Sequence, residues 1–336
     1  MGIVLNIQDL TVTYKTRRGT ACGVNNVSLE LEENRTLGLA GESGCGKSTL
    51  GRAIMRLVPY PGRIVNGSII LDIDRDIEYQ GGFIGKGPKD LMEFSENEMR
   101  ALRGEEVAYI FQDPMTSLNP MKTIGSHFVE LVKAHYPTME KAEAIERAKE
   151  ILENLGILPE RVDDYPHQFS GGMRQRVMIG LGLALRPRLL IADEPTTSLD
   201  VIVEAQILQQ MAQLKEKFNL TMMLITHNLG VLAQTADSIA IMYAGRIVEV
   251  ADTGALFERP QHPYTKALLE SVPDVTKPEK TLCCIPGSPP DLIQPISGCP
   301  YGPRCAQMKD TCRRIEPLLV RSSTGGLVAC NQYTGD

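Results

Sequence analysis

The chain has 336 residues, enough for one large domain with a smaller one, and its 43% apolar and 23% charged residues are ordinary for a globular protein. A net charge of −6 argues against nucleic acid as the main partner, because phosphate backbones bind basic surfaces. The chain lacks a run of about 18–20 apolar residues that could span a membrane, and its N-terminus lacks the features of a secretory signal. These properties predict a cytosolic protein.

The first half of the chain alternates between strand and helix patterns. Residues 3–40 predict several short strands, and residues 48–58 predict a helix that ends at Pro59. Residues 64–95 are rich in turn residues, and "GGFIGKGPKD" (81–90) within them predicts an exposed loop, whereas "VAYIF" (107–111) predicts a strand.

The second half repeats the alternation and then loses it. Helices are predicted at 138–155 and 172–185, strands at 189–193 and 221–226, and a hairpin at 238–250. The short, wholly apolar strands are typical of a parallel sheet covered on both faces, which predicts an α/β fold. Beyond about residue 272 the chain is rich in proline and aperiodic, which predicts a separate small module.

A phosphate-binding loop is predicted at "GESGCGKST" (41–49), directly after an apolar strand and before a helix. Its glycines let backbone N–H groups surround phosphate oxygens, and the helix N-terminus adds a positive dipole end. Lys47 would reach the β- and γ-phosphates and Ser48 would bind Mg²⁺. The predicted nucleotide-binding residues here are Gly41, Glu42, Ser43, Gly44, Cys45, Gly46, Lys47, Ser48 and Thr49.

Two adjacent carboxylates end the strand in "LLIADEP" (189–195). Asp193 can hold Mg²⁺, directly or through water, and Glu194 is placed to polarise the attacking water.

Several further motifs resemble those of ABC-transporter ATPases, in that family's order and across roughly residues 3–250. They are "FSGGMRQR" (169–176) for the signature, "FQDP" (111–114) for the Q-loop, "SLD" (198–200) for the D-loop, "ITHN" (225–228) for the switch histidine, and Tyr14 for the adenine-stacking aromatic. The resemblance implies a P-loop ATPase with a RecA-like mixed-sheet core, an antiparallel β subdomain and a helical signature subdomain at about 113–180. It implies an ATPase domain over residues 1–255 and a Cys-rich metal-binding extension over 256–336.

The resemblance also implies roles for single residues. Gln112 would contact Mg²⁺ or the attacking water, and His227 would contact the γ-phosphate. Ser170, Gly171 and Gly172, with Asp200 of the D-loop, would bind nucleotide held by a second ATPase subunit. Together with Glu194 and Lys47, Gln112 and His227 form the predicted catalytic set, and Ser48, Gln112 and Asp193 form the predicted Mg²⁺ set.

This sequence departs from the family pattern in three places. Phe169 stands where leucine is usual and Met173 where glutamine is usual, and residues 72–95 are longer than the usual segment. The signature serine and glycines remain, so we expect the two substitutions to be tolerated, whereas nothing in the sequence explains the longer segment.

The downstream sequence is similar to the ATP-binding subunits of oligopeptide and dipeptide importers. The similar segments are "FQDPMTSLNP" (111–120), "LFERPQHPYTKALLESVP" (256–273) and "GCPYGPRC" (298–305). The resemblance implies a peripheral ATPase at the cytoplasmic face of the membrane. Its partners would be a second ATPase subunit, alike or related, two transmembrane permease subunits and, indirectly, an extracellular solute-binding protein. Relatives of this group also carry nickel complexes or sugars, so these substrates stay open beside peptides.

Two other classes compete with a transporter ATPase. A soluble ABC ATPase of DNA repair or translation usually has two cassettes, a long coiled coil or basic surfaces, which this sequence lacks. A regulatory protein that binds ATP without turnover would not need Glu194 and His227.

Six of the eight cysteines lie between residues 283 and 330. Cys299, Cys305, Cys312 and Cys330 are separated by 5, 6 and 17 residues, without the C-x₂₋₄-C spacing of most structural zinc sites. A cytosolic location disfavours disulfides, so the clustered cysteines need another explanation. Their wide spacing favours a [4Fe–4S] cluster, with zinc or free thiols as alternatives. Cys283 and Cys284 are adjacent, so they are left out of the predicted ligand set.

Overall fold

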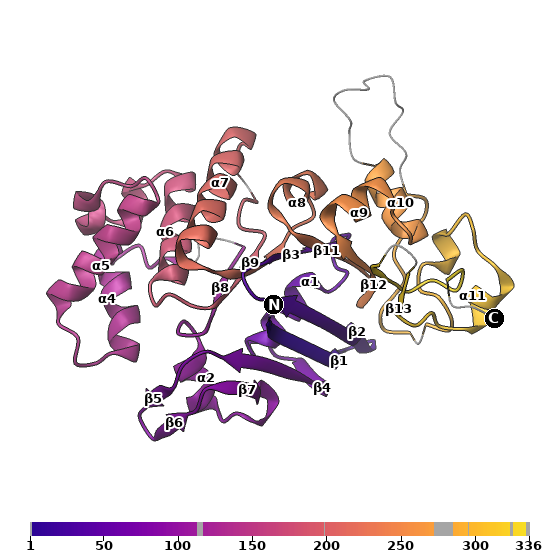
Figure 1. Cartoon of the computed structure of the whole chain (residues 1–336), viewed down its shortest axis with the longest axis horizontal. Coiled ribbons are helices and arrows are strands. Elements are labelled where there is room, and N and C mark those ends of the chain that lie inside the picture. Colours follow the sequence, from indigo (N-terminus) through magenta and orange to yellow (C-terminus); the bar gives the residue numbers. More distant parts are fainter. Residues whose placement is uncertain are drawn as a thin grey trace. The chain divides into compact units, whose positions relative to one another are not determined.

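The computed structural model describes residues 2–112, 117–197, 199–271, 285–294, 296–322 and 325–333 (Figure 1). The chain divides into two compact units. Unit 1 consists of Met1–Leu5, Leu31–Asn34 and Ile70–Met223, and unit 2 consists of Asn6–Glu30, Arg35–Ile69 and Leu224–Asp336. No helix within the described ranges is long and apolar enough to cross a membrane.

Unit 2 contains a sheet ordered β13-β14-β12-β11-β3. Its strands are β3 (Thr36–Ala40), β11 (Ser238–Tyr243), β12 (Arg246–Asp252), β13 (Val320–Arg321) and β14 (Leu327–Val328). Its helices are α1 (Lys47–Ile54), α8 (Leu229–Thr235), α9 (Thr253–Glu258), α10 (Pro263–Glu270), η4 (Gly302–Arg304) and α11 (Asp310–Arg314). Strand β3 is parallel to β11 and every residue of it is buried, as expected for a strand covered on both faces.

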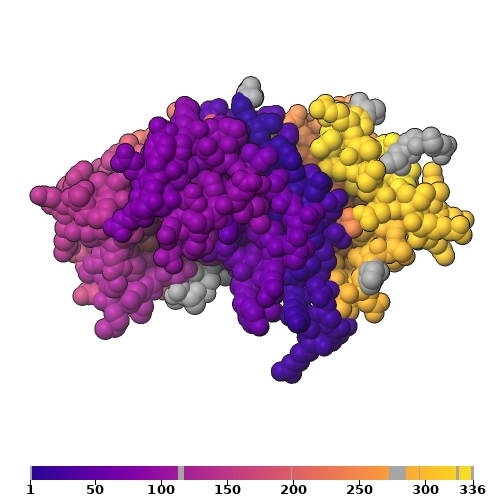
Figure 2. Space-filling model, turned by 90° about the horizontal axis from the view of Figure 1, so that it is seen from below, coloured from indigo at the N-terminus to yellow at the C-terminus, as the bar shows by residue number. Residues whose placement is uncertain are grey.

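The predicted hairpin at 238–250 is confirmed, because β11 and β12 pair antiparallel across Ala244 and Gly245. Both turn residues have positive φ (49° and 80°), the geometry that short hairpin turns require. The described residues beyond 285, which are yellow in Figure 2, gather on one side of the face shown there.

Three long strands run through both units. They are β1 (Ile3–Thr16), β2 (Gly19–Glu32) and β4 (Gly62–Ile73), in the order β2-β1-β4. The predicted strands of residues 3–40 are therefore present, but the first two are longer than the sequence pattern indicated. Strand β10 (Thr221–Ile225) also lies on the division between the units.

Unit 1 holds the helical part of the chain. Its helices are α2 (Glu96–Leu102), α4 (Ile124–His135), α5 (Lys141–Asn154), α6 (Gly171–Leu183) and α7 (Val201–Phe218), with 3₁₀ turns η1 (Leu91–Glu93), η2 (Pro159–Asp163) and η3 (Pro166–Gln168). Its short strands are β5 (Ile77–Tyr79), β6 (Gly82–Ile84), β7 (Gly87–Asp90), β8 (Val107–Ile110) and β9 (Leu189–Asp193). Strands β8 and β9 are parallel and β10 follows β9 in the sheet, which confirms the predicted parallel core.

The prediction of an exposed loop at 81–90 is wrong, because β6 and β7 lie there. Strand β4 extends to Ile73 and pairs antiparallel with β7, while β5 and β6 form a hairpin. The apolar alternation at Ile69, Leu71 and Ile73, all at most 1% exposed, is the strand signal that the neighbouring asparagine and glycines obscured. Helix α2 then begins at a capping box between Ser95 and Glu98.

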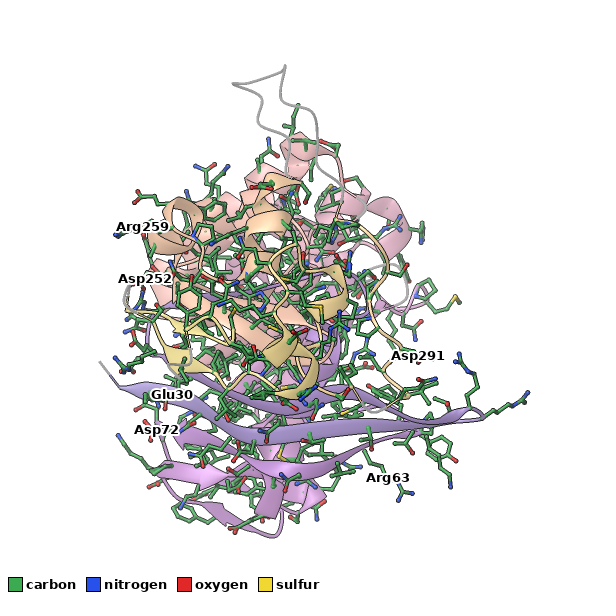
Figure 3. All side chains as sticks on the ribbon, turned by 90° about the vertical axis from the view of Figure 1, so that its right-hand side faces the viewer. Glu30, Arg63, Asp72, Asp252, Arg259 and Asp291 are labelled. Carbon is green, nitrogen blue, oxygen red and sulfur yellow. The ribbon has the colours of Figure 1, made fainter. Side chains whose placement is uncertain are left out.

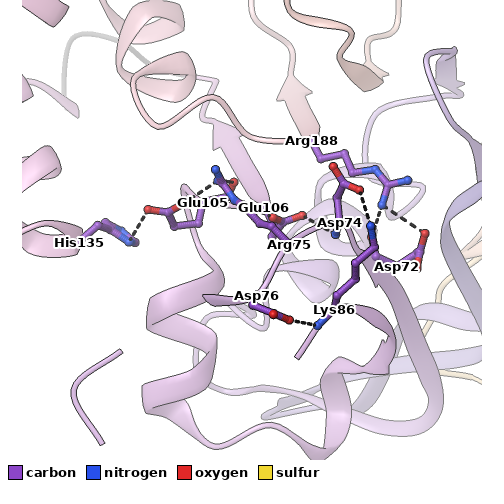
Figure 4. A network of polar contacts seen from close by, with 9 residues as sticks. All are labelled: Asp72, Asp74, Arg75, Asp76, Lys86, Glu105, Glu106, His135 and Arg188. Atoms are coloured by element: carbon purple, nitrogen blue, oxygen red, sulfur yellow. Dashed lines mark hydrogen bonds and ion pairs between the residues drawn. The ribbon is translucent and has the colours of Figure 1, made fainter. Parts of the chain in front are cut away.

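A polar network anchors the start of this segment within unit 1 (Figure 4). The guanidinium of Arg75 donates to Glu105 Oε2 at 2.7 Å and to Glu106 Oε1 at 3.2 Å. Arg188 donates to Asp72 and to Glu33, at 3.2 and 2.9 Å. Because Glu105 and Glu106 are 5% and 2% exposed, Arg75 neutralises two carboxylates that water barely reaches.

Candidate functional site

The phosphate-binding loop has the predicted context, with β3 before it and α1 after it. Gly41 and Gly46 have φ values of 152° and 109°, which only glycine adopts without strain. The Lys47 ammonium is 5% exposed and donates to the carbonyl oxygens of Gly41 (2.8 Å) and Glu42 (3.1 Å). The loop therefore wraps around its own lysine, with the N-terminus of α1 facing the same loop.

Close packing makes Gly46 irreplaceable. A Cβ atom there would lie 2.1 Å from the carbonyl oxygen of Gly23, on backbone that cannot move aside. We expect Gly46→Ala to weaken Mg·ADP binding at least about tenfold, because both the positive φ and the contact oppose a side chain. Gly254→Ala is the matched control, since its Cβ would meet nothing within 4 Å. Titration calorimetry of both variants tests this, and equal affinities would contradict it.

Tyr14 and His227 both belong to unit 2, as does the loop. The Tyr14 hydroxyl lies 3.2 Å from Oγ1 of Thr49, the last loop residue. His227 is exposed and directly follows Thr226, whose N–H donates to the carbonyl of Leu39 in β3. Strand β3 leads straight into the loop, so the structure brings both predicted side chains to the same end of the sheet as the loop.

The two predicted carboxylates lie at the end of β9 in unit 1. Asp193 is fully buried and accepts a 2.7 Å hydrogen bond from the Tyr109 hydroxyl. Glu194 has a φ of 47°, and its Oε2 accepts from Gln112 Nε2 at 2.8 Å and from Thr197 Oγ1 at 2.9 Å. The structure therefore joins Gln112 and Glu194, which the sequence analysis treated separately.

Sequence reasoning missed the residues that orient these carboxylates. Tyr109 lies opposite Ile191 in the β8–β9 register, which brings its hydroxyl within reach of Asp193. Thr197 is three residues after Glu194 and could have been found as a turn hydroxyl that bonds back along the chain.

The signature segment forms the second feature of unit 1. Ser170 is the N-cap of α6 and accepts from the N–H of Met173 at 3.4 Å, while Asp200 caps α7 through Val203 at 3.0 Å. Both caps line one pocket of about 430 Å³ with Gly172. A Cβ on Gly172 would lie 2.6 Å from Val203, so glycine keeps this pocket open. The pocket also contains Gly171, Met173, Arg176 and Leu199.

Parts of the predicted site lie outside the described residues. These are Asp113–Pro114 of the Q-loop and Ser198 of the D-loop. The loop, Tyr14 and His227 belong to unit 2, whereas Gln112, the β9 carboxylates and the signature pocket belong to unit 1.

The predicted cysteine site is not supported. Cys299, Cys305, Cys312 and Cys330 all have free thiols, and the backbone of Cys299 bonds to that of Cys312 at 2.8 Å. Within the described ranges, no group of three or more His, Cys, Asp or Glu side chains is arranged to hold a metal ion. The structure therefore does not support the expected [4Fe–4S] or zinc site.

Cys312 and Cys330 are buried, and Cys299 and Cys305 are partly buried. Burial raises the pKa of Cys299 to about 11, and burial also raises the pKa values of Cys305 and Cys330. The excluded pair Cys283 and Cys284 lies outside the described residues.

Comparison with known proteins agrees with this geometry. The family described as "ABC transporter" matches residues 24–197, and "Oligopeptide/dipeptide transporter, C-terminal region" matches residues 248–312. The dipeptide transport ATP-binding protein DppD of Bacillus subtilis is 42% identical over 97% of this chain and 94% of its own length. The oligopeptide transport ATP-binding protein OppD of the same organism is 44% identical over 96% of this chain and 87% of its own length.

A solved structure confirms the predicted fold. The ATP-binding cassette MJ0796, in a post-hydrolysis state bound to ADP and Pi, superposes with a TM-score of 0.62 at 24% identity, over 74% of this chain and 98% of that one. The likeness to that structure shows the fold of an ATP-binding cassette. The chain belongs to the ABC transporter family and is an ATPase. Within that family it falls in the group of oligopeptide and dipeptide transporter ATP-binding subunits.

Proposed function

We propose that this chain hydrolyses ATP to drive the import of dipeptides or oligopeptides through a membrane transporter. The observation that carries the proposal is the near full-length similarity to dipeptide and oligopeptide transport ATP-binding proteins, including the C-terminal region particular to that group. Nickel complexes and sugars remain less favoured substrates, since the similar relatives quoted above are named for peptides.

In the proposed site, the loop residues 41–49 bind the nucleotide phosphates and Tyr14 stacks on the adenine. Glu194 accepts a proton from the attacking water, and His227 contacts the γ-phosphate. Support for the role of Glu194 comes from its hydrogen bonds with Gln112 and Thr197, which hold its carboxylate at the end of β9.

The donor set fits Mg²⁺. Asp193 offers a carboxylate, Ser48 a hydroxyl and Gln112 an amide oxygen, which are the hard oxygen ligands that this ion prefers. When bound, Mg²⁺ would neutralise charge on the phosphate oxygens. The hydrogen bond from the Tyr109 hydroxyl would hold the Asp193 carboxylate in place.

Partners follow from the proposed role. The signature pocket with Ser170 and Gly172 would receive the γ-phosphate of nucleotide held by a second ATPase subunit, alike or related. ATP would thus join two subunits, and hydrolysis would release them, a two-state cycle that permease subunits can follow. We keep the boundary between the ATPase domain and the C-terminal extension at residue 255, and the peripheral location at the cytoplasmic face, as parts of this proposal.

Transport measurements test the substrate class. The chain is co-expressed with permease and binding-protein subunits of the same source, and uptake of a labelled dipeptide and a labelled pentapeptide is measured with and without it. We expect peptide uptake to depend on the chain and to stop with Lys47→Ala. Uptake of nickel or a sugar instead of peptide would overturn the substrate, and ATPase activity without permease association would favour a soluble ABC ATPase.

A further inference from the structure

The second residue of the phosphate loop is held mainly by the C-terminal part of the chain. The carboxylate of Glu42 accepts two hydrogen bonds from Arg304, Nη1 to Oε2 at 2.9 Å and Nη2 to Oε1 at 3.0 Å. Its backbone N–H donates to the Tyr264 hydroxyl at 2.9 Å, and its carbonyl accepts from Lys47. All of these residues belong to unit 2. Every polar group of Glu42 is therefore engaged, two of the three by residues more than 200 positions away in the chain.

Arg304 is itself rigidly held. Its side chain is 7% exposed, and its remaining donors reach the carbonyl of Pro286 (2.8 Å), the Tyr243 hydroxyl (3.3 Å) and the carbonyl of Ile285 (3.5 Å). A guanidinium has five N–H donors in a fixed planar arrangement, and here they bond to the Glu42 carboxylate as well as to the acceptors just named. The contact with Glu42 is thus preorganised rather than a chance surface ion pair.

An aromatic cluster supports the same contact. Tyr243, Tyr264 and Tyr301 are at most 3% exposed, with ring centroids 4.6 to 5.3 Å apart. Tyr301 and Arg304 both lie in the segment "CPYGPRC" (299–305), which the sequence analysis singled out and the ATPase chemistry does not use. This segment reaches the loop through packed side chains and not through a flexible tether.

The charge of Glu42 explains why such a contact matters. A carboxylate in a loop that wraps phosphates repels the ligand, and because the Glu42 side chain is only 23% exposed, water screens this repulsion in part. Arg304 cancels that charge, and together with Tyr264 it fixes the peptide group that follows Gly41.

We propose that Arg304 is a positioning residue for nucleotide binding, so that the C-terminal extension sets the affinity of the phosphate loop through Glu42. The proposal rests on the nucleotide-binding function proposed above. It gives "CPYGPRC" a role that needs no metal, since the segment acts by holding a guanidinium against the loop.

A double-mutant cycle on the full chain tests this, with Mg·ADP affinity from calorimetry and KM and kcat from ATP hydrolysis. We expect Arg304→Ala to weaken Mg·ADP binding about tenfold and to raise KM more than it lowers kcat, because an uncompensated carboxylate faces the phosphates. Arg304→Lys keeps the positive charge but cannot form the bidentate contact with Glu42, so we expect an intermediate loss of Mg·ADP affinity. In the Arg304→Ala/Glu42→Gln double variant, affinity should return toward that of Glu42→Gln alone.

Arg18→Ala is the matched control. Arg18 also forms an ion pair with the C-terminal segment, to Asp291 at 2.6 Å, but its side chain is 73% exposed; Asp291 is labelled in Figure 3. We expect the Arg18→Ala variant to bind Mg·ADP as tightly as the unmodified chain. Unchanged Mg·ADP affinity in Arg304→Ala and Arg304→Lys would overturn the proposal. A double variant that binds Mg·ADP no more tightly than Arg304→Ala would also overturn it, because that result would indicate a purely structural role. Failure of the unmodified chain to bind Mg·ADP would instead overturn the proposed function.

Discussion

Glu194→Gln should lower the ATP hydrolysis rate by more than about a hundredfold while leaving Mg·ATP binding nearly intact. The amide keeps the size of the side chain and can still accept from Thr197 Oγ1, which is 2.9 Å from the carboxylate in the structure. It cannot take a proton from water, however. The loss should therefore appear in kcat and not in KM.

Phosphate release in steady state, with calorimetry for affinity, measures the two effects separately. Glu204→Gln is a matched control, because Glu204 accepts from the neighbouring Thr196 at 2.7 Å but lies on α7, ten residues after Glu194. Activity of Glu194→Gln close to that of this control would exclude Glu194 as the base.

Arg75→Ala should lower the stability of the chain by about 2 kcal/mol, or about 5 °C in thermal midpoint. Removing the guanidinium leaves Glu105 and Glu106 buried without their shared partner. The expected loss of stability is smaller than the usual cost of breaking a buried ion pair, because the Arg75 side chain is 45% exposed and water partly screens its charge. Lys86→Ala is the control, since Lys86 and its partner Asp74 are 67% and 66% exposed.

The same variant has an expected pH dependence. Burial already raises the pKa of Glu106, while Arg75 and Arg188 counteract that rise. Without Arg75 the folded pKa rises further above the unfolded value, so the folded state binds a proton that the unfolded chain releases, and stability increases as pH falls toward the folded pKa. The difference in unfolding free energy between Arg75→Ala and the unmodified chain should therefore become smaller from pH 7.5 to pH 5.5. A difference that does not change with pH would show that the lost stability comes from packing alone.

Much of the site could be read from short stretches of sequence. The loop at 41–49 and the carboxylates at 193 and 194 were predicted because their chemistry depends on the few residues around them: a strand end, glycines with positive φ, and a helix N-terminus. The caps at Ser170 and Asp200 are local for the same reason.

Other features depended on pairing across the chain and were missed or misjudged. The bond from Tyr109 to Asp193 spans 84 residues and follows from the β8–β9 register. The pairing of β4 with β7 was missed, because neither the partner strand nor the burial of Ile73 is visible in the local pattern. The four cysteines had a spacing that favoured a cluster, but spacing along the chain does not tell whether the side chains converge on one point.

The sequence by itself determined which chemistry the chain carries, because backbone geometry within about ten residues makes a phosphate loop or a metal-binding strand end. Only the tertiary structure decided which side chains restrain that chemistry. The contact between Glu42 and Arg304 joins residues 262 positions apart, and no local preference encodes it. It forms because the fold brings the Arg304 guanidinium, whose side chain is 7% exposed, against the carboxylate of Glu42.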